Sequence, residues 1–347
     1  MHCHRCKGRA ACRAGPRQQR GAALVVAMLV FALTAALAVA MQGDFQRFVQ
    51  RTSNLLVSEQ AHAYLRGAED LAALVLQRDW DEDKQEQLIR DDFTELWAQE
   101  SQPFPLDDRG WLRAAPLEDL QGRFNLNSLA AQARQEGGVP KYTPEQEQFI
   151  RLLQALDGPD ISQFEAAAIT LSVSDWLDSD SSVLADGAED DYYGALTPAY
   201  RAANRAMGSV SELRAVANVT PEIYLALAPY VTVWPREPEP INIHTAPGPV
   251  LRSINARNDL NPLSAADAEA LVEIQRGEGF VDKAAFLANP VFAGKELGDI
   301  RGLLGERSSW FLLSVTVELA DRNTHLYSVL QRKNRRVKAV VRAGGSL

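Results

Sequence analysis

The sequence of 347 residues is poor in cysteine, and its few cysteines are confined to one end. All three precede Gly21: Cys3, Cys6 and Cys12. Together with His2 and His4 they include a Cys-x-x-Cys spacing that zinc ligands use, but no second ligand pair follows at finger spacing. Residues 22–347 can therefore form no disulfide and need another source of rigidity, for which a bound metal is one candidate.

Acidic residues are absent before Asp44, and residues 22–41 carry no charge of either sign. A helix of these 20 residues would span about 30 Å, the thickness of the hydrocarbon core of a bilayer. Six basic residues precede this apolar run: Arg5, Lys7, Arg9, Arg13, Arg17 and Arg20. The positive-inside rule then predicts a single membrane helix, with a cytoplasmic N-terminus and the bulk of the chain across the membrane.

Basic residues are in the minority after Gly21. The six before it leave 30 of the 36 for the remainder, against all 45 acidic residues, which gives a net charge of about −15. This balance disfavours nucleic acid and anionic lipid as partners, because both need a basic surface. It suits an exported soluble region that binds cations.

The motifs of common catalytic sites are missing as well. Gly-x-Ser-x-Gly, the phosphate-binding Gly-x-x-x-x-Gly-Lys-Ser/Thr and His-Glu-x-x-His do not occur. Only His62, His244 and His325 follow Gly21, too far apart to place a catalytic or zinc triad. We expect that the protein is not an enzyme.

The pattern of apolar residues changes along the chain from helical to strand-like. A helix is predicted from the membrane to about residue 78, a proline-rich loop over 101–116, and a first short strand within 117–127. Residues 128–229 read as an all-helical unit, and 241–305 as helical again after a strand at 231–234 and a stiff linker. Three segments near the C-terminus are β-rich and form a predicted antiparallel meander: 310–319, 326–331 and 337–342.

The segment 175–191 contains seven carboxylates and no basic residue. So many negative charges in one folded loop would repel each other, and a hard divalent cation with six to eight oxygen ligands relieves this repulsion. The predicted calcium ligands, for one or two ions, are Asp178, Asp180, Asp186, Glu189 and Asp190. The spacing is not that of an EF-hand. A solvated acidic loop is the simpler alternative, and a glycosidase-like carboxylate pair is a remote one.

The junction at Gly21 resembles the prepilin peptidase site of type IV pilins and type II secretion pseudopilins. This resemblance implies a cut between Gly21 and Ala22, methylation of the new amino terminus and retention of the apolar helix. Most members carry Glu at the fifth position after the cut, where this chain has Val26. In that respect the chain resembles the minor pseudopilin K family, whose members are thought to occupy the tip of the filament.

Two further regions carry the resemblance to this family. The strings W-L-D-S-D and G-A-E-D-D-Y-Y, with F-N-L-N upstream, resemble its calcium-binding loop. Residues 241–290 resemble a helix-hairpin-helix module with Gly277-Glu278-Gly279 as the hairpin turn. Glu278 in the turn and the acidic residues Asp267, Glu269 and Glu273 before it disfavour DNA binding by this module.

The resemblance implies an α+β fold. A long N-terminal helix, as in pilins, packs on a C-terminal antiparallel sheet, with a large all-helical insertion and a helix-hairpin-helix-like (SAM-like) module. The expected segments are a cytoplasmic leader (1–21), a transmembrane and assembly helix (22–43), a helix continuation with the first strand (44–127), and an inserted helical domain with the metal loop (128–229). A strand, linker and hairpin module (230–305) and the C-terminal strands (306–347) complete them.

The function implied is that of a minor pseudopilin at the tip of a periplasmic pseudopilus, priming its assembly for export of folded proteins across the outer membrane. The implied partners are minor pseudopilins I and J, other pseudopilins, the prepilin peptidase and the inner membrane, which the chain would cross once with its soluble domain in the periplasm. The alternatives are a minor pilin of a type IV pilus and a membrane-anchored DNA-uptake receptor.

Overall fold

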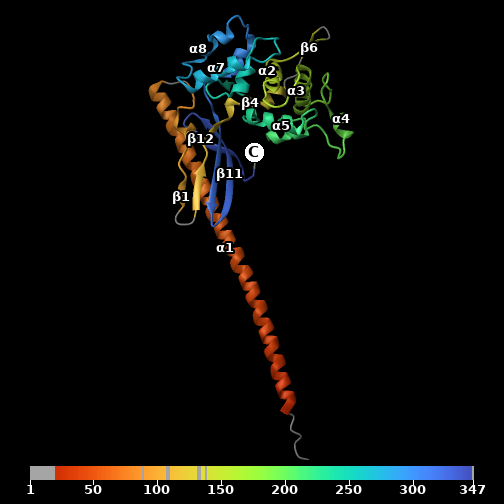
Figure 1. The fold of residues 1–347 in the computed structure, drawn as a ribbon, viewed down its shortest axis with the longest axis vertical. Coiled ribbons are helices and arrows are strands. Elements are labelled where there is room, and N and C mark those ends of the chain that lie inside the picture. The colour runs from red at the N-terminus through yellow and green to blue at the C-terminus, as the bar shows by residue number, and fades with distance from the viewer. Residues whose placement is uncertain (1–19, 88–89, 107–109, 131–133, 137–138, 346–347) are drawn as a thin grey trace, which may run out of the picture. The chain divides into compact units, whose positions relative to one another are not determined.

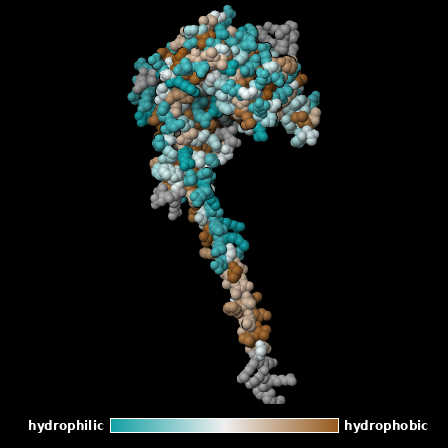
Figure 2. All heavy atoms as spheres, in the orientation of Figure 1, coloured by the Kyte–Doolittle hydropathy of each residue, from teal (hydrophilic) through white to brown (hydrophobic). Residues whose placement is uncertain are grey.

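A computed structural model describes residues 20–87, 90–106, 110–130, 134–136 and 139–345. The chain divides into two compact units, Met1–Glu59 and Gln60–Leu347, which are described separately. The helix α1 (Arg20–Glu86) begins in the first unit and ends in the second. Within the first unit its residues are exposed almost throughout. Hydrophobic side chains gather over its N-terminal part, coloured brown in Figure 2.

In the second unit, one face of α1 is buried. Its buried residues recur every three or four positions, which is the spacing of a single helix face: Ala61, Leu65, Glu69, Ala72, Leu76, Asp79 and Asp83. This part of the helix runs alongside the strands of an antiparallel sheet (Figure 1). A helix that shields one face of a sheet is the expected layered arrangement for an α+β fold.

The sheet has the strand order β1-β2-β10-β11-β12, and β3 also pairs with β10. Its members are β1 (Phe104–Leu106), β2 (Gly110–Ala114), β3 (Glu118–Asp119), β10 (Trp310–Leu319), β11 (Arg322–Lys333) and β12 (Arg336–Ala343). All its pairings are antiparallel, with Val315 opposite both Ala114 and Leu326. The tight turn between β10 and β11 places Ala320 and Asp321 at positive φ, as a two-residue hairpin loop of type I′ requires.

The predicted meander at the C-terminus is therefore present, but the prediction of a loop over 101–116 is wrong. β1 and β2 lie in that segment, and they precede the first strand that the sequence indicated. Pro105 lies in β1, at the edge of the sheet, where its missing N–H removes no bond to a further strand. Because β2 pairs with β10, some 200 residues later, no local pattern could reveal it.

A first helical module lies between β4 (Phe124–Asn125) and β7 (Val231–Thr232), which pair in parallel. It contains α2 (Pro144–Gln154), α3 (Gln163–Leu177), α4 (Asp190–Gly194) and α5 (Pro221–Leu227). The prediction that 128–229 is all-helical is wrong in one detail, because β5 (Arg134–Glu136) and β6 (Val139–Lys141) form a short antiparallel pair there. These strands are too short for a period to be recognised in the sequence.

A second helical module lies between β8 (Ile241–Asn242) and β9 (Leu304–Gly305), another parallel pair. It contains α6 (Gly248–Arg252), α7 (Ala265–Arg276) and α8 (Lys283–Leu287). The 3₁₀ turns among the described residues are η1 (Leu96–Ala98), η3 (Leu120–Gly122), η4 (Leu126–Ala130), η5 (Val210–Ala215), η6 (Ala228–Tyr230), η7 (Pro290–Phe292) and η8 (Gly298–Leu303). Thus each module begins and ends at a two-residue parallel bridge.

The two modules open with the same local structure. In the first, Asn125 accepts a hydrogen bond from the amide of Asn127 at 3.0 Å; in the second, Asn242 accepts one from the amide of His244 at 3.0 Å. The side-chain amide of each asparagine donates in turn to a distant part of the fold, to the carbonyl of Pro235 or of Asp91. The F-N-L-N and I-N-I-H strings are therefore equivalent anchors, and one hydrophobic core extends through both modules.

Candidate metal site

Helix α3 brings the first predicted ligand into place. Ser162 and Glu165 form a capping box at its start, and the helix ends with Asp178 as its C-terminal cap. Asp178 then accepts a hydrogen bond from the amide of Asp180 at 3.3 Å, and Asp180 accepts one from the amide of Ser182 at 2.7 Å. These turns direct the chain away from the helix while both carboxylates stay beside its end.

The structure brings three of the five predicted ligands together. Asp178, Asp180 and Glu189 each offer a carboxylate oxygen, and these oxygens all lie within 4.8 Å of one another. Asp178 and Glu189 are buried, whereas Asp180 is exposed. Burial, and then the nearby carboxylate of Asp178, raises the pKa of Glu189. Three carboxylates at this separation repel one another unless a proton or a cation lies between them.

The carboxylate of Glu189 has an unusual environment. The residue is only 5% exposed, and neither of its oxygens has a hydrogen-bond partner. A buried carboxylate without donors is costly, and a metal ion is one way to satisfy it. The available atoms are all hard oxygens, which fit Ca²⁺ and not a thiolate-seeking or imidazole-seeking metal. The residues present therefore fit the predicted ion.

Asn204 is a candidate ligand that the sequence did not reveal. Its side-chain amide donates to the backbone carbonyl of Asp180 at 2.8 Å, and its Oδ1 atom is buried with no partner. Amide oxygens are common calcium ligands. Asn204 lies outside the acidic segment, so neither charge nor spacing in the sequence indicated it.

The other two predicted ligands are not members of this group. Asp186 occupies a turn position with φ of 64° and is exposed. Asp190 begins α4, where it accepts a hydrogen bond from the amide of Ala202 at 3.0 Å and lies 3.9 Å from the guanidinium of Arg201. Its carboxylate thus has partners within the protein, and the prediction of Asp186 and Asp190 as direct ligands finds no support in this geometry.

A second acidic group lies at the end of α1. Asp79, Asp83, Asp91 and Glu95 also place carboxylate oxygens within 4.8 Å of one another. Here, however, Arg332 pairs with both Asp79 and Asp91, and Arg307 pairs with Asp83 at 3.1 Å. Burial, and then the neighbouring Asp79 and Asp91, raises the pKa of Glu95 to about 10, so Glu95 is neutral at pH 7. Two guanidinium groups and one proton already offset three of the four carboxylates, so this cluster serves as a structural joint.

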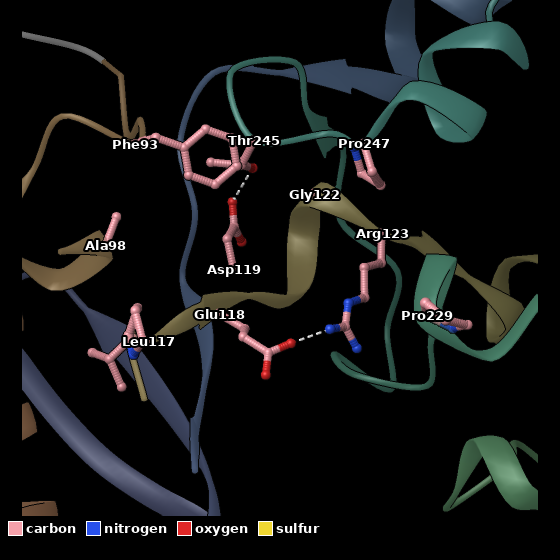
Figure 3. A pocket seen from close by; sticks show the side chains of 11 residues that line it. Phe93, Ala98, Leu117, Glu118, Asp119, Gly122, Arg123, Pro229, Thr245 and Pro247 are labelled. Atoms are coloured by element: carbon pink, nitrogen blue, oxygen red, sulfur yellow. Dashed lines mark hydrogen bonds and ion pairs between the residues drawn. The ribbon is translucent and has the colours of Figure 1, made fainter. Parts of the chain in front are cut away.

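A pocket of about 300 Å³ lies where the sheet meets the modules (Figure 3). Its acidic side chains are used within the protein: Glu118 pairs with Arg123, and Asp119 accepts a hydrogen bond of 2.5 Å from Thr245. Asp119 also accepts from Asn242 at 3.0 Å and from Ser308. This carboxylate is a buried connector between the sheet and the second module, with its hydrogen-bonding capacity already used.

The predicted cleavage junction lies at the start of α1. Gly21 and Ala22 are exposed in the first turns of this helix, and so is Val26 one turn later. Within the described residues, α1 is the one helix long and apolar enough to cross a membrane, with a mean hydropathy of 2.7 over its most apolar stretch. Residues 1–19, which contain the cysteines, lie outside the described residues.

The hairpin turn predicted at Gly277-Glu278-Gly279 follows α7. Gly277 caps α7, and the amide of Gly279 donates to the carbonyl of Ile274 at 2.8 Å. Gly279 has φ of 72°, a conformation that glycine adopts without strain. Glu269, Glu273 and Glu278 are exposed around this hairpin.

Comparisons with known proteins give one consistent result. The family described as type II secretion system (T2SS), protein K, matches residues 122–236 and 241–306, which correspond closely to the two modules. Type II secretion system protein K of Pseudomonas aeruginosa is 35% identical over 95% of this chain and 94% of its own length. The protein of the same name from Pectobacterium carotovorum is 31% identical over 94% of this chain and 97% of its own length.

A solved structure agrees with these relatives. The chain is similar to one in the crystal structure of the GspK-GspI-GspJ complex from the type 2 secretion system of enterotoxigenic Escherichia coli. The TM-score is 0.72 at 26% identity, and the match covers 86% of this chain and all of the other. The α+β architecture, with a long N-terminal helix and an antiparallel sheet, is thus shared. The chain belongs to the type II secretion system protein K family.

Proposed function

We propose that this chain is a minor pseudopilin that forms the tip of a periplasmic pseudopilus and primes its assembly. In this role, residues 22–41 anchor the chain in the inner membrane and the remainder lies in the periplasm. Processing after Gly21 would retain the apolar helix and leave a methylated amino terminus on Ala22. Family membership and the exposed apolar part of α1 support the anchor.

The observation that carries the tip position is the pair of modules inserted beside the sheet. Residues 124–232 and 241–305 add two helical bodies to a helix-and-sheet unit that is otherwise pilin-like. Such a bulky subunit is difficult to stack inside a thin filament but can end one. Val26 adds to this argument, because it cannot supply the carboxylate that normally pairs with the amino terminus of a neighbouring subunit.

The proposed partners are minor pseudopilins I and J. The complex that resembles this chain contains a K, an I and a J subunit, and the whole of its matching chain is covered. The full chain is coexpressed with its I- and J-type subunits, and the membranes are then solubilised in detergent. Purification should yield a stable ternary complex with one copy of each subunit. Recovery of many copies per filament, together with the major pseudopilin and without I and J, would contradict the tip assignment.

We propose that Asp178, Asp180 and Glu189, with the side-chain oxygen of Asn204, hold a calcium ion. The buried oxygens of Glu189 that lack donors support this site. The ion would supply the positive charge that neutralises the carboxylates, and so would fix the loop after α3. Because the chain has no cysteine after Gly21, a disulfide cannot supply this rigidity in place of the ion.

The calcium proposal is tested with the full chain in detergent micelles after removal of metal by EDTA. Calcium at 100 times its dissociation constant stabilises a folded protein by about 2.7 kcal/mol, which should raise the melting temperature by several degrees. Asp180→Ala should abolish the rise. Asp191→Ala removes an exposed carboxylate of the same segment outside the group, and should keep it. Equal responses of all three proteins would show that the loop is merely acidic.

We propose that the α7–α8 hairpin is a SAM-like packing module without a nucleic-acid ligand. The exposed glutamates around its turn support this view, since they repel phosphate. A gel shift of duplex DNA by the full chain that weakened steeply with salt would contradict it.

A further inference from the structure

The third carboxylate of the acidic segment that the structure buries, Asp175, is not among the proposed ligands. It lies in the last turn of α3, three residues before Asp178, and its side chain is fully buried. Both of its oxygens accept from the backbone amide of Leu184, at 3.2 Å each. The hydrogen-bonding partner of this carboxylate is therefore the backbone of the loop that leads from Asp180 back to Glu189.

The returning loop is closely fitted to this side chain. A turn closes between Leu184 and Gly187, where the amide of Gly187 donates to the carbonyl of Leu184 at 2.9 Å. A Cβ atom added at Gly187 would lie 2.0 Å from Oδ2 of Asp175, so a side chain at this position and the carboxylate exclude each other. Glycine at position 187 is thus explained by contact with Asp175, and not by its backbone angle.

The position of this contact determines where Glu189 lies. Glu189 follows Gly187 by two residues, and Asp178 follows Asp175 by three. Asp175, which tethers the loop, lies in α3, and the ligand Asp178 caps the same helix. The ligand Glu189 lies directly after the turn that Asp175 holds. The ten residues between Asp178 and Glu189 would otherwise have to be ordered when the ion binds, at a cost in conformational entropy.

We propose that Asp175 is the positioning residue of the calcium site: it stays outside the coordination sphere and, by binding the amide of Leu184 and packing against Gly187, presents Glu189 to Asp178 and Asp180. This inference rests on the proposed calcium site. It separates the carboxylates of the segment by role, with Asp178, Asp180 and Glu189 facing the ion and Asp175 facing the loop. A metal site organised before the ion arrives binds more tightly, because less order has to be created on binding.

The alternative is that Asp175 is itself a ligand. The two roles differ in the absence of metal, since a tether protects the loop before any ion is present. They also differ in how Gly187→Ala behaves. This change pushes the loop away from Asp175 while every carboxylate is kept. If Asp175 acts as the tether, removing its carboxylate makes room for the added methyl group, and the effects of the two changes are not additive.

The experiment uses the full chain in detergent micelles, with calcium affinity measured by titration calorimetry and amide exchange measured by mass spectrometry in EDTA. Asp175→Ala and Gly187→Ala should each lower the affinity by at least tenfold and should speed exchange over residues 184–189 without calcium. Asp180→Ala should lose calcium binding and the acceptor of the Ser182 amide, with exchange over residues 184–189 unchanged. Asp191→Asn should match the wild type in both measurements.

Asp175→Asn keeps one acceptor oxygen, and it should show intermediate effects if Asp175→Ala fails to fold. The double variant Asp175→Ala/Gly187→Ala should bind no more weakly than either single variant. Wild-type affinity and exchange in Asp175→Ala would overturn the positioning role, and so would a double variant whose losses simply add. Absence of calcium binding in the wild type would instead overturn the calcium site itself, while the exchange data would still report whether Asp175 tethers the loop.

Discussion

Arg332 of β11 and Asp79 of α1 form an ion pair in which both side chains are almost completely buried, at 2% and 5% exposure. The same guanidinium binds Asp91 and donates to the carbonyl of Ser308 at 2.9 Å. The central carbon of this guanidinium, Cζ, lies 5.0 Å from the ring centre of Phe311. One side chain thus joins the end of α1, the segment that follows it and the sheet.

Loss of Arg332 should therefore destabilise the fold strongly. Arg332→Met keeps the apolar stem but leaves Asp79 and Asp91 buried without their partner, which costs about 3–5 kcal/mol. The matched control is Arg335→Ala, which breaks the pair with Asp81, where the side chains are 67% and 39% exposed. That pair should contribute about 1 kcal/mol or less. Urea unfolding of the full chain in detergent measures the free energy of unfolding of both variants. Equal losses of stability would contradict the role of Arg332 as a structural joint.

The imidazole of His244 should make stability depend on pH. It is buried, neither ring nitrogen has a partner, and burial followed by Arg90 lowers its pKa to about 4. In the unfolded chain this imidazole has its ordinary pKa of about 6.5. Between pH 6.5 and pH 4 the unfolded chain therefore binds a proton at His244 that the folded chain does not bind. Stability falls as the pH drops through 6.5 and has lost about 3 kcal/mol by pH 4.

His244→Leu should remove this part of the pH dependence, because leucine has a similar volume and does not titrate. Melting temperatures of the wild type and the variant should differ more at pH 4.5 than at pH 7.5, with the variant favoured at the lower pH. His325→Gln, at an exposed position, is the control. Parallel pH profiles for the wild type and His244→Leu would refute the assignment.

Asn204 should contribute to calcium affinity although it lies outside the acidic segment. Asn204→Gly removes the unpartnered oxygen and the bond to Asp180, while it permits the positive φ of 46° at this position. We expect a loss of about tenfold in affinity by titration calorimetry. Asn218→Gly is closely matched, with φ of 65° and a side-chain bond to Ser172, and should bind calcium normally.

Gly21→Ala should block processing of the leader if the junction is a prepilin peptidase site. The change is sterically neutral within the chain, since no atom lies within 4 Å of an added Cβ. Any defect would then reflect recognition by the peptidase. Intact-mass measurement of the membrane-inserted protein should show the full chain for Gly21→Ala and a chain starting at Ala22 for the wild type. Gly43→Ala, equally open, should be processed normally.

The sequence predicted the elements whose signals are local. The apolar run from Ala22, the helical period of α1 and the alternation in β10–β12 all lie within single segments, and each element is present. The strands β1 and β2 were missed because Pro105 indicated a loop and their partner β10 is distant in sequence. Their register is a tertiary property.

The ligands of the candidate metal site also divide into those with a local sequence signal and those without one. Asp178 and Asp180 follow a helix end, and Glu189 returns after Gly187, so these three followed from charge and turn signals. Asp190 is an N-terminal helix residue paired elsewhere, and Asn204 approaches from a separate loop. Only the folded backbone distinguishes ligands from the other carboxylates of the segment.

The parallel bridges β4–β7 and β8–β9 have a mechanical consequence. Each bridge joins the two ends of a module, so the chain leaves the region of the sheet and returns to it at neighbouring points. Tension applied along α1 passes into the sheet through Asp79–Arg332 and Glu69–Arg342, without stretching either module. The modules are thus outside the load path, and under the proposed function a growing filament can push or pull on this subunit while the loop after α3 keeps its geometry.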